Sequence, residues 1–210
     1  MRMRRREIIL AAGSAAILPA SSIPAFADAP AGTVVGMVGS CSLVHAGQST
    51  PLKLSDPVAA SDEVDVPADG KLKLRMSDGS IISLAAGTRM SVSAYQTDAA
   101  GKRQNAQITL AQGLLRAVVA PVERPATFEV STAVGTAAVR STDWFIEAKP
   151  GSAQVGVLSG SVVLSSTATG RAVTIPARWG ARLEAGRDPV EARVWAPEEF
   201  QAVISRTSLP

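Results

Sequence analysis

The most reactive residues are scarce, because the chain contains one cysteine and one histidine. Cys41 and His45 lie four positions apart, a spacing that suggests a thiolate–imidazole dyad. In an extended strand, however, four residues span about 13 Å, and the sequence offers no oxyanion site for a nucleophile. One Cys and one His also exclude an intrachain disulfide and the usual zinc ligand sets. We therefore expect Cys41 to be a small apolar residue near the first strand and His45 to be a loop residue.

Carboxylates are the next candidates, since four of them cluster between residues 62 and 70. Their spacing differs from that of a helix–loop–helix calcium site, and Pro67 interrupts them. No serine stands in the G-x-S-x-G setting of a hydrolase nucleophile. The sequence therefore predicts a solvated strand edge and turn at residues 62–70, with no catalytic residue, no bound metal and no cofactor.

Three side chains are the candidates for contacting a partner or ligand: Arg140, Trp144 and Trp179. Arg140 comes just before a strand, where its guanidinium either faces a partner or is fixed by Asp143, Glu129 or backbone carbonyls and sets the strand register. A tryptophan on a sheet of small residues is either a ligand platform or a core filler. The sequence leaves both alternatives open for each of the three.

The elements that must position these residues follow a period of two. Residues 71–76 alternate polar and apolar side chains, which places Leu72, Leu74 and Met76 on one face of a strand. Asp78-Gly79 then tolerates the positive φ angles of a tight turn, and residues 81–84 form the returning strand. This pattern predicts a β-hairpin.

Short strand-like runs separated by glycine-containing turns recur along the chain. They are residues 33–38, 89–95, 106–110, 114–119, 127–130, 144–148, 154–158, 161–165, 171–175, 181–185 and 190–194. Gln112-Gly113 is one of the predicted turns, and residues 96–105, which lack periodicity, are predicted to form an exposed hairpin loop. The fold class is therefore all-β, a twisted, solenoid-like stack of short antiparallel strands.

One short helix is predicted at the C-terminal end, within residues 196–210. Pro197 suits the first helical position, and the two glutamates that follow it complement the positive end of the helix dipole. Phe200, Val203 and Ile204 share one face, and the helix is expected to end near Arg206.

The first 27 residues have the composition of an export signal. Four arginines precede an apolar run of 11 residues, and Ala25-Phe26-Ala27 forms a small-x-small cleavage site. Arg5-Arg6 followed by Glu7 and two isoleucines resembles the twin-arginine signal, and an ordinary secretory signal is the alternative. The apolar run is too short for a permanent membrane span, which needs about 20 residues.

Cleavage after Ala27 would also change the charge of the chain. The precursor has a net charge of +3, whereas the part after residue 27 contains 17 basic and 17 acidic residues. A neutral chain lacks the excess positive charge that a nucleic-acid-binding protein needs. We expect an exported periplasmic protein that binds no nucleic acid.

Several segments, taken in order, resemble the FecR domain family. They are Asp78-Gly79-Ser80-Ile81-Ile82-Ser83-Leu84, then residues 108–118 with Gln112-Gly113-Leu114, then Phe128-Glu129-Val130, Val139-Arg140-Ser141-Thr142-Asp143-Trp144 and Gly156-Val157-Leu158-Ser159-Gly160. The resemblance covers about residues 33–165 and implies a periplasmic, non-enzymatic β domain. In the best-known members this domain relays iron–siderophore status from an outer-membrane transporter to a sigma factor.

Two departures limit what the resemblance implies. Ser141 stands where the family usually has glycine after the arginine, so a positive φ is not expected there. Transmembrane members carry a cytoplasmic anti-sigma segment and a membrane helix before the domain, where this chain has its export signal. We therefore expect that this polypeptide alone does not relay a signal across the inner membrane.

These observations predict three parts: a cleaved export signal at residues 1–27, a FecR-like all-β domain at 28–195, and a C-terminal helix and tail at 196–210. The predicted function is that of a non-enzymatic recognition or regulatory module, which binds an envelope protein through a sheet edge or an exposed strand face. The alternative is an envelope protein that binds or processes polysaccharide through exposed tryptophans. The oligomeric state is open.

Overall fold

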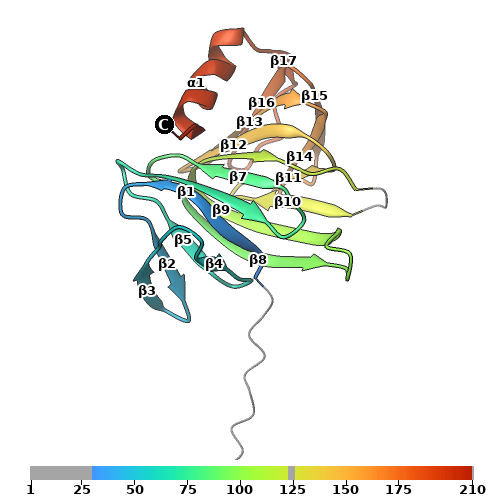
Figure 1. Cartoon of the computed structure of the whole chain (residues 1–210). Coiled ribbons are helices and arrows are strands. Elements are labelled where there is room, and N and C mark those ends of the chain that lie inside the picture. Colours follow the sequence, from blue (N-terminus) through green and yellow to red (C-terminus); the bar gives the residue numbers. More distant parts are fainter. Residues whose placement is uncertain (1–29, 123–125, 210) are drawn as a thin grey trace, which may run out of the picture.

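The computed structural model describes residues 30–122 and 126–209, so the predicted export signal lies outside the described residues. The strands form two sheets that share one long strand, β9 (Figure 1). Sheet A has the order β4 (Pro57–Val58), β1 (Gly32–Val38), β6 (Lys71–Met76), β7 (Ile81–Leu84), β9 (Arg103–Val118), β12 (Asp143–Lys149), β13 (Ser152–Ser159), β16 (Trp179–Glu184) and β17 (Arg193–Val194).

Sheet B has the order β3 (Gln48–Pro51), β2 (Ser42–His45), β5 (Glu63–Asp65), β8 (Arg89–Thr97), β9, β10 (Thr127–Ser131), β11 (Gly135–Val139), β14 (Ser161–Ser166) and β15 (Ala172–Pro176). Among the described strands only the pair β9–β10 is parallel; the other pairs are antiparallel. The predicted all-β fold with one C-terminal helix is confirmed, and the short strands β2 to β5 and β11 are additions to it.

The predicted β6–β7 hairpin is present. Leu74 pairs with Ile82 and Leu72 with Leu84, and Gly79 in the turn has a φ of 86°. Leu72, Leu74 and Met76 are buried between the two sheets, as their alternation predicts. The rest of this core comes from the inward-facing positions of the other strands in the same way.

The predicted turn at Gln112-Gly113 is wrong, because β9 continues through it. The first part of β9 pairs with β8 and β10 in sheet B, and residues 113–118 pair with strands of sheet A. Gly113 has a φ of 93°, and a Cβ there would lie 2.5 Å from the Cα atom of Thr88. The glycine therefore serves to bend one strand from sheet to sheet rather than to reverse the chain.

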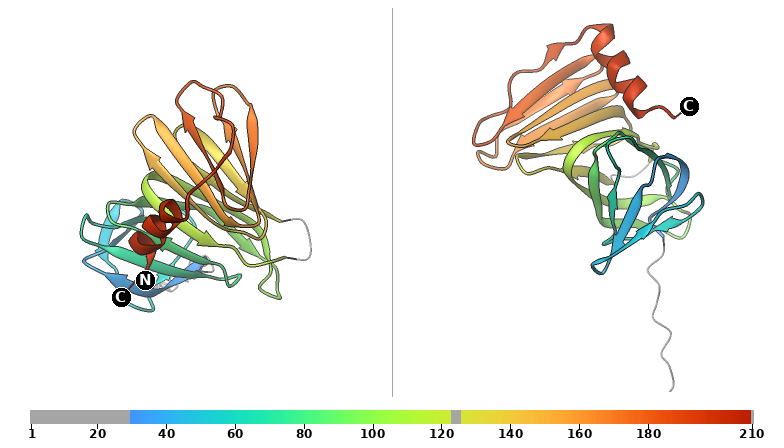
Figure 2. Two further views of the ribbon diagram at one scale, coloured as in Figure 1. Left: turned by 90° about the horizontal axis from the view of Figure 1, so that it is seen from above. Right: turned by 90° about the vertical axis from the view of Figure 1, so that its left-hand side faces the viewer.

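The C-terminal helix α1 (Pro197–Thr207) starts at the predicted proline and lies on the outer face of sheet A (Figure 2). Glu199 caps its first turn by accepting a hydrogen bond from the backbone N–H of Ala196 at 2.9 Å. Phe200 and Val203 pack against Phe145 and Trp195 in a second, smaller core. Within the described residues, no helix is both long and apolar enough to span a bilayer.

Candidate recognition groove

The structure separates the three predicted binding residues. Arg140 is exposed just after β11, whereas Trp144 is fully buried in the core, and its indole N–H has no hydrogen-bond partner in the described part of the chain. Trp179 begins β16 with 37% of its surface exposed. The structure therefore leaves Arg140 and Trp179 accessible at separate places on the surface and encloses Trp144.

Arg140 lines a groove of about 720 Å³ on the outer face of sheet B, at the adjoining ends of β10, β11 and β14. Its walls combine hydroxyl and amide groups with small apolar side chains. The lining residues are Gln104, Ala126, Thr127, Phe128, Glu129, Ala138, Val139, Arg140, Ser141, Thr142, Gly160, Ser161 and Val163. Such a groove offers hydrogen bonds and one cation to a bound chain.

The groove end is shaped by a close approach of two turns. Gly160 has a φ of 83°, and a Cβ there would lie 2.6 Å from the backbone oxygen of Ser141. The buried Thr142 hydroxyl donates to the backbone oxygen of Ser161 at 3.3 Å, and the Thr142 carbonyl accepts from the backbone N–H of Val119 at 2.9 Å. The Arg140–Thr142 turn is thus held tightly against its neighbours.

Of the two alternatives for Arg140, fixation by Asp143 or Glu129 is not seen among the described residues. Asp143 instead accepts two hydrogen bonds from Arg116, at 3.0 and 2.8 Å. Among the described residues, the Arg140 guanidinium has no ion-pair partner, and Glu129 lies in the same groove without contacting it. The Arg140 side chain is therefore available to a partner.

The fixed arginine is Arg103, which the sequence places in an exposed loop. The predicted hairpin is present, but β8 and β9 extend into it and Arg103 is 1% exposed. One end of its guanidinium donates to Asp78 and to the Ser80 hydroxyl. The other end donates to the backbone oxygens of Ala120 and Arg140, at 3.3 and 3.1 Å.

Asp78 is the second member of this buried network, and its side chain is 1% exposed. It accepts hydrogen bonds from the Tyr95 hydroxyl at 2.6 Å and from the Ser80 hydroxyl at 2.8 Å. Burial, followed by the hydrogen bond to Asp78, raises the pKa of Tyr95 well above its ordinary value. The guanidinium of Arg103 lies 5.3 Å from the ring centre of Phe128, which lines the groove. The buried network therefore lies on the inner side of the groove and packs against its lining residue Phe128.

Residues 62–163 match the model of a family described as FecR protein. This part of the chain is a FecR domain. The match contains the Arg140 groove and the Arg103 network completely, while β1 to β4 precede it and β15 to α1 follow it. No curated protein matches the chain.

Two solved structures share the fold. Both are crystal structures described as a candidate anti-sigma factor from Parabacteroides distasonis ATCC 8503, at 2.50 and 1.65 Å resolution, with a TM-score of 0.55 and 16% sequence identity to this chain. The alignments cover 67% of this chain and 62% and 63% of those chains. The chain thus spans less than two thirds of the structures it matches.

Cys41 and His45, which precede the FecR domain, bond to different partners. The Cys41 thiol is buried against the backbone oxygens of Val38 and Lys71, and burial raises its pKa. The His45 ring bonds to Asp62 at 2.6 Å. His45 therefore links the tip of the β2–β3 hairpin to the turn before β5.

The predicted solvated edge at residues 62–70 is only partly exposed. Asp62 is 3% exposed and accepts from the backbone N–H of Ala59 at 2.7 Å, while Glu63 and Asp65 pair with Arg89. Across the described residues, no group of three or more His, Cys, Asp or Glu side chains could hold a metal ion.

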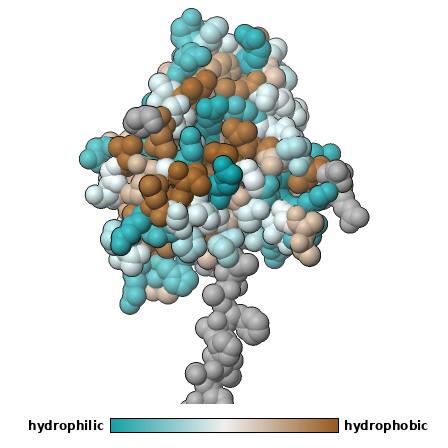
Figure 3. Space-filling view, viewed as in Figure 1, coloured by the Kyte–Doolittle hydropathy of each residue, from teal (hydrophilic) through white to brown (hydrophobic). Residues whose placement is uncertain are grey.

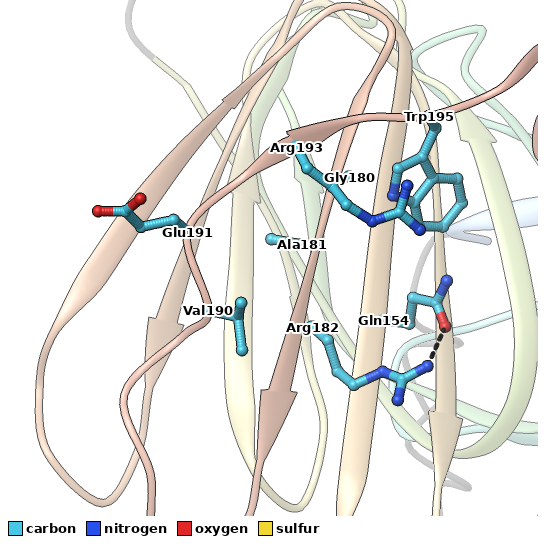
Figure 4. A pocket seen from close by; sticks show the side chains of 8 residues that line it. All are labelled: Gln154, Gly180, Ala181, Arg182, Val190, Glu191, Arg193 and Trp195. Atoms are coloured by element: carbon cyan, nitrogen blue, oxygen red, sulfur yellow. Dashed lines mark hydrogen bonds between the residues drawn. The ribbon is translucent and has the colours of Figure 1, made fainter.

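A smaller pocket of about 110 Å³ is lined by residues of β13, β16 and the segment 190–195 (Figure 4). Arg182 and Arg193 extend toward Gln154 and Trp195, and Glu191 points away. Arg193 already bonds to both carboxylate oxygens of Glu199, at 3.2 and 2.8 Å, which lowers the pKa of Glu199. Because this pocket is small and its Arg193 is already paired with Glu199, the Arg140 groove is the better candidate site.

Proposed function

We propose that this chain is a non-enzymatic regulatory module of the periplasm, which recognises an envelope protein through the Arg140 groove. The observation that carries the proposal is that every residue lining the groove falls within the FecR domain. The description of the two structural neighbours as an anti-sigma factor supports a role in signalling.

The chemistry of the groove favours a polypeptide as the ligand. Its hydroxyl and amide groups can pair with backbone N–H and C=O groups, and the guanidinium of Arg140, which has no ion-pair partner among the described residues, can bind a carboxylate. A polysaccharide site ordinarily needs an aromatic platform. Trp144 is enclosed in the core, Trp179 is not among the groove residues, and the lining residue Phe128 is 0% exposed, so the groove presents no aromatic platform.

Export is the part of the proposal that lies on the first 27 residues. The arginine cluster, the short apolar run and Ala25-Phe26-Ala27 support it. Mass spectrometry of the protein from the cell envelope should find Asp28 as the first residue, and an intact Met1 on the mature protein would contradict export. Replacing Arg5 and Arg6 by Lys should block export if the twin-arginine route is used.

Recognition is tested by photo-crosslinking in intact cells, with p-benzoylphenylalanine placed at Ser161 in the groove. The matched control places it at Leu54, which is 62% exposed and lies outside the groove. We expect a discrete protein adduct from position 161 that is absent from position 54 and is lost with Arg140→Glu. Glycan adducts alone, or a protein adduct that is insensitive to Arg140→Glu, would contradict the proposal.

A further inference from the structure

The outer face of sheet A is only partly covered by α1, which crosses the strands. The start of the helix packs near Phe145 on β12, and Lys71 on β6 donates to the backbone oxygens of Ser205 and Ser208 at 3.0 and 2.8 Å. The helix therefore leaves one row of outward-facing side chains free along its side. Figure 3 shows apolar side chains on this face around β1 and beside α1, interspersed with polar ones.

The register of the strands identifies this row. Arg75 on β6 pairs with Ile81 on β7, Ile81 pairs with Val118 on β9, and Val118 pairs with Asp143 on β12. Val118 is 45% exposed and Ile81 is partly exposed. We call Arg75, Ile81 and Val118 the α1-side row; Lys73 on β6 lies two residues nearer α1, at the level of Phe145.

The α1-side row and the neighbouring Lys73 carry positive charge that no described carboxylate neutralises. Lys73 and Arg75 have no carboxylate partner among the described residues. The carboxylate at the end of the row, Asp143, is held by Arg116. β6 is not an edge strand, because it pairs with β1 on one side and β7 on the other. Lys73 and Arg75 are therefore not needed to prevent edge-to-edge pairing with another chain.

The height of α1 limits what can reach the row. An α-helix with its side chains is about 10 Å across, so α1 stands above the sheet and keeps a flat bilayer away. The row lies two residues along the strands from the level of Phe145, about 7 Å away. Arg75 lies four residues, about 13 Å, along β6 from Lys71, which binds the other end of α1. The distance between the row and α1 therefore widens from about 7 to about 13 Å, a range that includes the 8–10 Å spacing of two packed helices.

We propose that the α1-side row binds an amphipathic helix of a partner protein, with apolar residues over Ile81 and Val118 and carboxylates against Lys73 and Arg75. This inference rests on the proposed function, because it requires a protein partner, and it names a second surface and the chemistry that this surface recognises. Helices bind in this way through apolar side chains spaced three and four residues apart.

The test is photo-crosslinking in intact cells with p-benzoylphenylalanine at Val118, followed by sequencing of the crosslinked peptide. We expect that peptide to have apolar residues at helical spacing with Asp or Glu beside them. Arg75→Glu should lower the adduct yield about five-fold or more, since it replaces an attraction by a repulsion. Arg171 is an exposed arginine just before β15, and Arg171→Glu is the matched control that should change the yield less than two-fold.

The position 161 crosslink from the groove separates the two proposals. An adduct at Ser161 without one at Val118 overturns the helix-binding row and leaves the proposed function standing. No adduct at either position overturns both. At Val118, a lipid adduct, a crosslinked peptide without acidic residues, or equal losses with Arg75→Glu and Arg171→Glu would also overturn the row proposal.

Discussion

Replacement of Arg103 by Met should destabilise the protein severely. The substitution removes the guanidinium but leaves the Asp78 carboxylate buried, with its side chain only 1% exposed. Removing one partner of a buried ion pair costs about 3–5 kcal/mol, because the remaining charge stays desolvated. The backbone oxygens of Ala120 and Arg140 lose their donor as well.

The assay is urea unfolding followed by tryptophan fluorescence. A loss of 3–5 kcal/mol is a large part of the roughly 5–15 kcal/mol that stabilises a typical domain. At about 2–4 °C per kcal/mol for a chain of this size, the melting temperature should fall by roughly 6–20 °C. Arg75→Met is the matched control, since Arg75 is exposed, and it should change stability by less than about 0.5 kcal/mol.

A second variant separates the ion pair from general damage to the core. Asp78→Asn combined with Arg103→Met removes the buried charge that the single substitution leaves behind. The double variant should therefore lose less stability than the sum of the two single variants, by about 0.5–3 kcal/mol. A loss below about 1 kcal/mol for Arg103→Met, or strictly additive losses, would refute the assignment of Arg103 and Asp78 as a coupled buried pair.

Three further outcomes test other parts of the fold. Leu74→Asp puts a charge on a fully buried position and should unfold the protein, as seen by the loss of its β-type circular dichroism; unchanged stability would mean that the register is wrong. Tyr95 is the only tyrosine, and its pKa is raised from the ordinary 10.0, so its stabilising effect is complete below pH 10 and is lost as the pH rises further. Tyrosinate absorbance should therefore appear together with alkaline unfolding, and titration near pH 10 in the folded protein would contradict the buried hydrogen bond. Phe200→Ala should release α1. Because Phe200 is half-buried, the loss of unfolding free energy should be smaller than the roughly 3–5 kcal/mol typical of a core phenylalanine. Faster hydrogen exchange of the helix amides should report this release.

The sequence predicts those strands and helices that depend only on residues close together in the chain. The β6–β7 hairpin follows from alternation over residues 71–76 and a glycine in its turn, and α1 follows from Pro197 and the apolar face after it. β3 escapes prediction because all four of its residues are exposed, so it has no apolar alternation. Gly113 is misassigned because a positive φ suits a bend between sheets as well as a turn.

The buried network escapes prediction for a different reason. Arg103 lies in a polar stretch without periodicity, and its partner Asp78 is 25 positions away, inside a turn whose own sequence fully explains an aspartate. Pairing between them arises only when β7, β8 and β9 assemble. The sequence does single out Arg140, which is exposed in the groove, and leaves open whether it is fixed or faces a partner; it gives no sign that Arg103 is the fixed arginine.

Arg103 and Arg140 have separate roles, since Arg103 fixes the backbone at Arg140 and the Arg140 side chain faces the groove. Arg103 binds the backbone oxygen of Arg140 from inside the domain, so the position of that residue does not depend on its own side chain. The Arg140 guanidinium, which has no partner among the described residues, can therefore be exchanged without disturbing the turn. Arg140→Glu should leave the unfolding free energy within about 0.5 kcal/mol of the original, since exposed substitutions seldom change it more. A loss of the groove adduct in Arg140→Glu then measures recognition rather than folding. The same loss in Arg103→Met would instead result from destabilisation of the buried network beneath the groove.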